Sequence, residues 1–114
     1  MSQELERQVI DRARALICEP KHWRQMVYAM DDHHRRVDWC SQEAVAFCVI
    51  GALRRAAYDL SGDRNRAILI ANRIAAKMTT IGFDELARIK VQHINDTKGH
   101  GEVLRLFSAA KNTS

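Results

Sequence analysis

The chain has 114 residues, which is enough for one hydrophobic core and too few for two independent domains. It is 46% hydrophobic and 28% charged, with five glycines and one proline, and this composition excludes a disordered or fibrous chain. The formal charge of +4 permits an anionic partner without requiring one, and we expect a single domain over residues 1–114.

The first two predicted helices meet at the single proline. Apolar residues recur at helical spacing from Leu5 to Ile17, which predicts a helix of about four turns. Pro20 ends this helix, because the residue before a proline is pushed out of the α region. Since proline is tolerated in a first helical turn, we expect a second, short helix from this point. Its apolar stripe would consist of Trp23, Met26, Val27 and Met30.

The next segment leads to the predicted centre of the fold. Residues 31–40 are polar and without periodicity, which is typical of a long connection. Ser41 then predicts a helix N-cap, and the run from 44 to 60 is apolar almost all round at its start. We therefore expect a buried central helix over about residues 42–60. Gly51 in its middle indicates a close approach between helices.

The remaining chain predicts further helices. A turn over 61–63 precedes a helix over 64–77, and Asp84 begins a shorter helix. A glycine-bearing loop over 95–101 leads into the last helix, which ends near 110. Because no segment alternates strictly between apolar and polar residues, we predict an all-α fold: a single compact bundle of five to six helices around the central one.

Several short motifs follow one another in an order that resembles a known family. They are Trp23, Ala44, Cys48 with Gly51-Ala52-Leu53, Asn95-Asp96, Glu102-Val103-Leu104 and Ala109-Ala110. The pattern resembles a domain-of-unknown-function family of small helical proteins from bacteria and their phages, over roughly residues 5–110. This resemblance implies an α-helical fold and carries no established activity, cofactor or substrate.

One stretch of polar residues suggests two different roles. Asp96 and His100 are four residues apart, with His93 and Asn95 close in sequence. A carboxylate that orients an imidazole is the core of acid–base and nucleophilic sites, so Asn95, Asp96 and His100 are candidate catalytic residues. In the structural alternative, which we favour, Asn95 and Asp96 form a turn or cap that leads into the last helix.

The cysteines and histidines predict neither a reactive thiol nor a metal site. Three cysteines without a C-x-x-C pair are most simply reduced thiols, and Cys48 lies between apolar neighbours that predict an inert, buried group. Cys18, His22, His33, His34 and Cys40 lack the paired spacing of structural zinc sites. We expect no metal and no cofactor.

Two features are candidates for partner binding. Arg66, Arg73 and Lys77 form a stripe on the predicted helix, and such a face binds nucleic acid weakly and with strong salt dependence. The alternative is an ordinary solvated helix face. Trp39 lies in the polar 31–40 segment. Its side chain is either buried in the core or exposed as a contact for a partner, and the sequence does not decide between these two alternatives.

The function classes follow from these features. The absence of nucleotide-binding, nucleophile-elbow and zinc-protease motifs lowers the expectation of an enzyme. No apolar run approaches the length of a membrane span and residues 1–10 lack the apolar core of a signal peptide, so we expect a soluble, cytoplasmic protein without a membrane partner.

The leading hypothesis is a non-catalytic accessory or regulatory protein that binds another macromolecule, preferably a protein. Its setting would be bacterial or phage-related, with interference in host defence as one example. Nucleic-acid binding through the basic face over 54–90 is the alternative. A small hydrolase centred on His93–His100 is the second alternative.

Overall fold

The computed structural model describes residues 3–79, 82 and 84–112. These residues form five α-helices, a short 3₁₀ helix and a two-stranded antiparallel sheet, which confirms the predicted all-α class and adds a small sheet to it. In chain order the elements are α1 (Gln3–Ile17), η1 (Pro20–His22), β1 (Ala29–Met30), β2 (Ala46–Phe47), α2 (Val49–Ser61), α3 (Arg64–Met78), α4 (Asp84–Thr97) and α5 (His100–Asn112).

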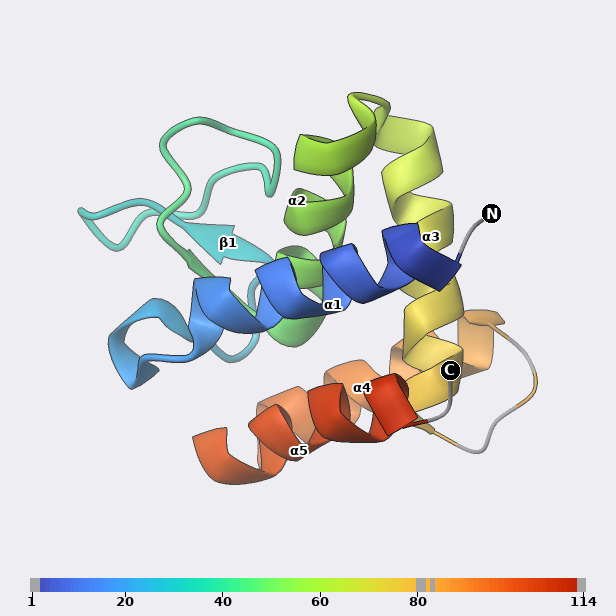
Figure 1. Ribbon diagram of the computed structural model, residues 1–114. Coiled ribbons are helices and arrows are strands. Elements are labelled where there is room, and N and C mark those ends of the chain that lie inside the picture. The colour runs from blue at the N-terminus through green and yellow to red at the C-terminus, as the bar shows by residue number, and fades with distance from the viewer. Residues whose placement is uncertain (1–2, 80–81, 83, 113–114) are drawn as a thin grey trace.

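The helix α2 lies at the centre of the molecule. It packs mainly against α3 and α1 and also contacts α4, and Figure 1 shows α1 crossing it while α4 and α5 lie to one side. A helix surrounded in this way needs apolar residues on most of its faces. The buried residues of α2 are Val49, Ile50, Gly51, Ala52, Leu53, Ala56 and Ala57. The predicted buried central helix is therefore present.

The start of this helix differs from the prediction. It begins at Val49, and most of the apolar run before it is extended, with β2 at its centre. Val45, just before β2, is 44% exposed, whereas both residues of β2 are buried. Ser41 is not the N-cap, because its Oγ accepts the Glu43 N–H at 3.1 Å and closes a local turn. Periodicity alone does not separate a short buried strand from helix.

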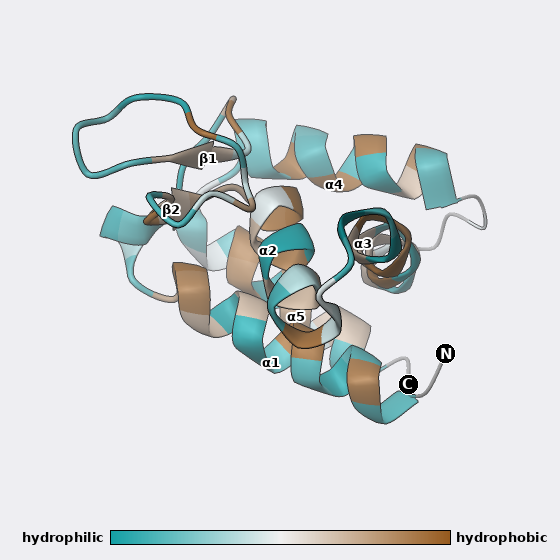
Figure 2. Cartoon of the chain, turned by 90° about the horizontal axis from the view of Figure 1, so that it is seen from above, coloured by the Kyte–Doolittle hydropathy of each residue, from teal (hydrophilic) through white to brown (hydrophobic). Residues whose placement is uncertain are grey.

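The predicted second helix is wrong beyond its first turn. Only Pro20–His22 is helical, as a 3₁₀ turn. The chain then runs beside β2, where the Arg24 N–H donates to the Phe47 carbonyl at 3.0 Å, and Met26 adopts a left-handed conformation with φ of 69°. Met26 is 71% exposed, so the supposed apolar stripe does not form one face. Figure 2 shows the strands and their loops as one layer beside the helices.

The last two helices are separated by a much shorter connection than expected. The helix α4 continues to Thr97 and α5 begins at His100, so the predicted loop over 95–101 is mostly helical. Asn95 and Asp96 therefore lie in the last turn of α4. This placement decides what their side chains can reach.

Candidate functional site

Asn95 connects segments that are distant in the sequence. Its side chain is fully buried and its Oδ1 accepts hydrogen bonds from Trp23 Nε1 at 2.7 Å and from the Val49 N–H at 3.0 Å. Its Nδ2 donates to the Arg24 carbonyl at 3.0 Å and to Asp96 Oδ1 at 3.1 Å. The Val49 N–H is one of the free donors at the start of α2, so Asn95 supplies a cap from another helix.

Asp96 and Gln25 fix the loop beside it. Asp96 Oδ1 accepts the N–H of Met26 at 2.8 Å and thereby holds the left-handed residue in place. Gln25 Nε2 donates to the carbonyls of Asn95 at 3.1 Å and Lys98 at 3.2 Å, which satisfies acceptors at the carboxyl end of α4. The prediction that Asn95 and Asp96 cap the last helix is therefore wrong. Their hydrogen bonds are made to the start of α2 and to the 24–26 loop, and that loop in turn binds the end of α4.

His100 is bound to a different segment. Its Nε2 donates to the Ile17 carbonyl at the end of α1 over 2.6 Å, and its ring centroid lies 5.4 Å from that of Trp23. Within the described ranges no hydrogen bond joins His100 to Asp96. The structure thus brings Asn95 and His100 to the same tryptophan, and it does not form the carboxylate–imidazole pair on which the hydrolase hypothesis depends.

The Cys48 thiol is enclosed at the start of α2. It is 1% exposed, and burial raises its pKa to about 11. Its Sγ accepts the Gly51 N–H at 3.3 Å, so this cysteine is the N-cap of α2. A thiol held protonated in an apolar environment is a poor nucleophile. Gly51 does mark a close approach, but the neighbour is the Tyr28 backbone carbonyl and not another helix.

Trp39 lies in the core. It is 3% exposed, its ring meets that of Tyr58 edge-on at 6.2 Å, and the Arg64 guanidinium stands 4.5 Å above it. Arg64 also donates to Asp38 at 2.8 Å, and this bond lowers the pKa of the Asp38 carboxyl. The indole therefore fills the core where the 31–40 segment crosses the helices, and it offers no surface to a partner.

Some cations of the basic face over residues 54–90 are paired with neighbouring acids. The pairs are Lys77 with Glu6 at 2.6 Å, Arg55 with Asp59 at 3.1 Å and Arg88 with Glu85 at 3.1 Å. The stripe predicted along α3 is therefore interrupted at Lys77. Arg66, Arg73 and Lys90 are exposed and have no side-chain partner in the part of the chain that the structure describes.

Concave surface lies between α1 and α2. Two hollows of about 470 Å³ each share Arg12 and Ala15 in their linings, and together they are called here the α1–α2 groove. Exposed Leu60 lines one of them and exposed Val45 lines the other. The full lining is Gln8, Asp11, Arg12, Ala15, Leu16, His22, Ala44, Val45, Phe47, Arg55, Asp59 and Leu60.

The groove is not evident in the amino-acid sequence. The available signal was Val45, an apolar residue that had to be placed on one face of either a helix or a strand. Assigned to a fully buried helix, it gave no indication of a surface. Leu60 was likewise assigned to the buried central helix, although it is 39% exposed near the end of α2.

The charged side chains in the groove are paired with one another or with a neighbour. The single carboxylate of Asp59 accepts hydrogen bonds from Arg12 at 3.1 Å and from Arg55 at 3.1 Å, so it neutralises only one of two guanidinium groups. Asp11 is paired with Lys111 at 2.9 Å. The charged residues that line the groove are therefore two arginines and two aspartates, and its lining carries no net formal charge.

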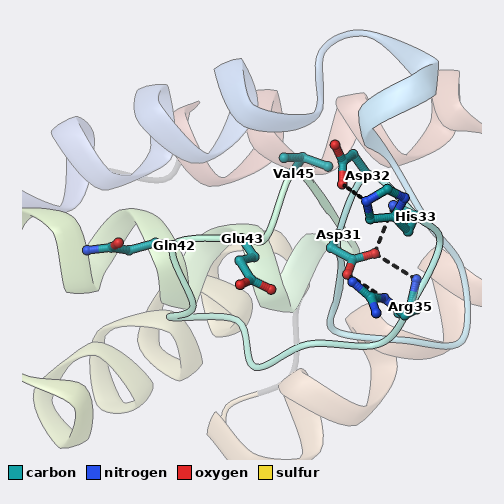
Figure 3. A pocket seen from close by; sticks show the side chains of 7 residues that line it. All are labelled: Asp31, Asp32, His33, Arg35, Gln42, Glu43 and Val45. Atoms are coloured by element: carbon teal, nitrogen blue, oxygen red, sulfur yellow. Dashed lines mark hydrogen bonds and ion pairs between the residues drawn. The ribbon is translucent and has the colours of Figure 1, made fainter.

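A third hollow, of about 340 Å³, adjoins the groove at Val45 and is polar (Figure 3). Asp31 organises its wall: Oδ1 accepts the N–H groups of His33 and Arg35 at 2.9 Å, and Oδ2 accepts Arg35 Nε at 3.0 Å. The backbone N–H of Arg35 is the main cause of the lowered pKa of the Asp31 carboxyl. This carboxylate is thus occupied by its own loop and shapes a turn.

Across residues 3–79, 82 and 84–112, no three His, Cys, Asp or Glu side chains gather in the manner of metal ligands. Over the same ranges, no helix combines the length and apolar character that crossing a bilayer requires.

Comparison with known proteins gives a family and no activity. No curated protein and no solved structure matches this chain. Residues 1–113 match the model of DUF6197, described as a family of unknown function. The match covers nearly the whole chain, in agreement with the resemblance of its motifs to a domain-of-unknown-function family. The chain therefore belongs to the family DUF6197.

Proposed function

We propose that this protein is a non-catalytic accessory or regulatory protein that binds another protein through the α1–α2 groove. The observation that carries the proposal is the pairing of exposed apolar side chains, Val45 at 44% and Leu60 at 39%, with a concave surface. Apolar side chains in a depression with a polar rim are characteristic of protein-binding sites. Arg12 lines both hollows. Arginine is one of the three residue types, with tryptophan and tyrosine, that are enriched among the residues that dominate binding energy at interfaces.

Other exposed apolar residues support the groove less well. Leu69, Leu86 and Ile89 are each more than half exposed, but they line none of the hollows described above. Leu69 lies on α3, and Leu86 and Ile89 lie about one helical turn apart on α4. They are therefore suitable control positions for testing the groove.

The proposal is also supported by the state of the candidate catalytic residues. The side chains of Asn95, Asp96 and His100 all bind backbone groups or the Trp23 indole, which is a structural use of each. A cytoplasmic setting and a bacterial or phage origin belong to the same proposal, with interference in host defence as one role of such a protein.

The test compares groove variants with matched controls in affinity capture. Immobilised Val45→Glu and Leu60→Glu proteins should lose the partner that the parent chain retains in a stoichiometric amount, because a carboxylate in the groove opposes apolar burial. Leu69→Glu and Leu86→Glu proteins should retain it. If the two controls lost the partner and the groove variants retained it, the partner would bind to α3 and α4 instead of the groove. Catalytic turnover of a small molecule by the pure protein would contradict the proposal as a whole.

Nucleic-acid binding is the second candidate, and the three exposed cations Arg66, Arg73 and Lys90 favour it. An Arg66→Glu, Arg73→Glu double variant should then lose affinity for duplex DNA. The affinity of the parent protein should fall steeply with salt, because phosphate contacts release counterions. Affinity that is independent of salt would contradict this mechanism.

A further inference from the structure

We propose that Arg54 on α2 and Arg88 on α4 form a binding site for a phosphate group, either as the free ion or as the monoester of a small molecule. The site is separate from the α1–α2 groove, because neither arginine lines that groove. The inference is therefore independent of the proposed function. It assigns a ligand to a partly buried cation that the described residues leave without a counter-ion.

The Arg54 side chain has no acceptor inside the protein. It is partly buried, and its Nε is enclosed without a hydrogen-bond partner. Its guanidinium carbon lies 4.9 Å from the centre of the Tyr28 ring, and over residues 3–79, 82 and 84–112 it forms no ion pair. Its terminal nitrogens remain accessible to a ligand. Because moving a charge out of water costs free energy unless an opposite charge compensates it, this guanidinium favours an anion.

The charges around Arg54 leave a positive excess. Burial is the main cause that lowers the pKa of Arg54, and the charges of Arg88 and Arg64 lower it further. Two side chains without carboxylates, Tyr28 and Cys48, act in the opposite direction. Arg64 is paired with Asp38 at 2.8 Å and Arg88 with Glu85 at 3.1 Å. Three cations thus share two carboxylates, and the uncompensated cation is Arg54.

Arg88 provides the second guanidinium from a neighbouring helix. The helices α2 and α4 contact each other, and the Arg88 side chain is only 19% exposed. Its Nη1 donates to Gln92 Oε1 and its Nη2 to Glu85 Oε1, both at 3.1 Å, and each of these nitrogens carries a second N–H. Glu85 is 74% exposed, so its pairing with Arg88 is weak and an incoming anion can replace it.

A phosphate group suits two guanidinium groups better than a carboxylate does. One guanidinium fork satisfies both oxygens of a carboxylate, whereas a phosphate monoester offers three acceptor oxygens and a charge of about −1.5 to −2 near pH 7. This charge compensates Arg54 and replaces the carboxylate of Glu85 at Arg88. The backbone of duplex DNA is a poorer ligand, because it needs a row of protruding cations and Arg54 is partly buried.

The probes are inorganic phosphate, phenyl phosphate and benzoate, each titrated into the full chain at constant ionic strength. Nuclear magnetic resonance of the ¹⁵N-labelled protein follows the arginine side-chain signals and the backbone signals of α2 and α4. Inorganic phosphate and phenyl phosphate should shift the signals of Arg54 and Arg88, and benzoate should bind about tenfold more weakly or less. Binding of inorganic phosphate alone would identify the free ion as the ligand. Equal affinity for benzoate would overturn the choice of phosphate.

Variants locate the binding. Arg54→Met removes the charge at a similar side-chain length and should lower the affinity for phenyl phosphate by about tenfold or more, because charge-assisted hydrogen bonds are lost. Arg88→Met should also weaken binding. The matched control is Arg73→Met, which removes an exposed cation on α3 and should bind as the parent chain does. Circular dichroism of each variant verifies that it is folded.

The outcomes test this inference apart from the proposed function. If Arg54→Met bound phenyl phosphate as tightly as the parent chain and Arg73→Met, the inference would be overturned; should Arg54→Met fail to fold, Arg88→Met decides in the same way. Binding of duplex DNA through Arg54 without binding of phenyl phosphate would also overturn it, in favour of a nucleic-acid site. Capture of a partner through the groove is measured separately, so either proposal can fail while the other stands.

Discussion

Asn95 provides the sharpest prediction at the scale of single residues. Replacing it by alanine leaves Trp23 Nε1 and the Val49 N–H without acceptors in a buried position. Each donor left without an acceptor away from water costs about 1–3 kcal/mol, so the loss of both should lower the free energy of unfolding of Asn95→Ala by about 2–6 kcal/mol. Urea unfolding followed by circular dichroism measures this loss. A loss below about 1 kcal/mol would show that the amide does not hold these segments together.

Asp96→Ala is the matched comparison. Its carboxylate also binds a backbone N–H, but the partner residue Met26 is 71% exposed and water can replace the lost acceptor. We therefore expect a loss of about 0.5–2 kcal/mol, the range for losing a helix cap. If Asp96→Ala proved more damaging than Asn95→Ala, the hydrogen bonds would not explain the stability of this region.

The cysteines yield a prediction about pH. Burial raises the pKa of Cys48 to about 11, while Cys18 is exposed. At about pH 8 a disulfide reagent should label Cys18 rapidly and Cys48 only after unfolding, because the thiolate is the reactive form. Absorbance of the released thiol, followed by peptide mapping, distinguishes the two. Rapid labelling of Cys48 in the folded protein would contradict its enclosure.

The sign of the linked stability change follows from the same shift. The thiol of an unfolded chain has an ordinary pKa of about 9.0, below the folded value of about 11. The unfolded state therefore loses this proton first as pH rises. The contribution of Cys48 to stability is complete below about pH 9 and is lost between about pH 9 and pH 11. Cys48→Ala should remove this alkaline loss from the pH dependence of stability.

At the scale of secondary-structure elements, helices with sustained apolar periodicity were predictable from the sequence. Segments whose conformation depends on tertiary contacts were not. The 64–77 helix and the end of the first helix agree with α3 and α1 to within a residue or two. Residues 44–48 are apolar and fit a helix or a strand equally well, and only pairing with β1 makes residues 46–47 a strand.

The candidate site shows the same limit. A structural role for Asn95 was predictable, because Asn near a helix end favours hydrogen bonds to backbone groups. The partners were not predictable, because Val49 and Trp23 lie 46 and 72 residues away in the chain. Local spacing suggested the next helix instead, since nothing in one sequence reports contacts at that separation.

Gly51 provides the prediction for α2. A Cβ on this residue would overlap the Tyr28 carbonyl, which belongs to the backbone and has little freedom to move. Gly51→Ala should therefore destabilise the fold by about 1–3 kcal/mol, although alanine is the better helix former. Thermal unfolding of the variant measures the effect.

Gly101 in α5 is the matched control for this prediction. A Cβ there meets nothing within 4 Å, and the residue lies in a helix. Gly101→Ala should be neutral or should stabilise the protein by up to about 1 kcal/mol. If both variants lost the same amount of stability, the contact between residue 51 and Tyr28 would not explain the effect of Gly51→Ala.

At the scale of the whole molecule, long-range polar contacts join the ends of the helices around one core. Buried apolar residues from Val9 to Ala110 form a single cluster with contributions from all five described α-helices. His100 ties α5 to the end of α1, and Asn95 ties α4 to the start of α2. Because these links cross the chain, no segment of the cluster can separate without breaking buried contacts elsewhere, and we expect one cooperative domain.

The two tryptophans allow this expectation to be tested from both sides of α2. Trp23 contacts Asn95 and His100 near the junction of α4 and α5, whereas Trp39 contacts Tyr58 and Arg64 near the junction of α2 and α3. In Trp39→Phe the fluorescence reports the first region alone, and in Trp23→Phe it reports the second.

Within each variant, the urea midpoint from fluorescence should coincide with the midpoint from circular dichroism at 222 nm, which follows the helices of the whole chain. The comparison is made inside one protein, so the stability lost through the substitution itself does not affect it. A fluorescence midpoint that precedes the circular dichroism midpoint in only one variant would identify that side of α2 as a separately unfolding unit. The domain would then have to be divided there, because cooperative unfolding requires both sides to lose their structure together.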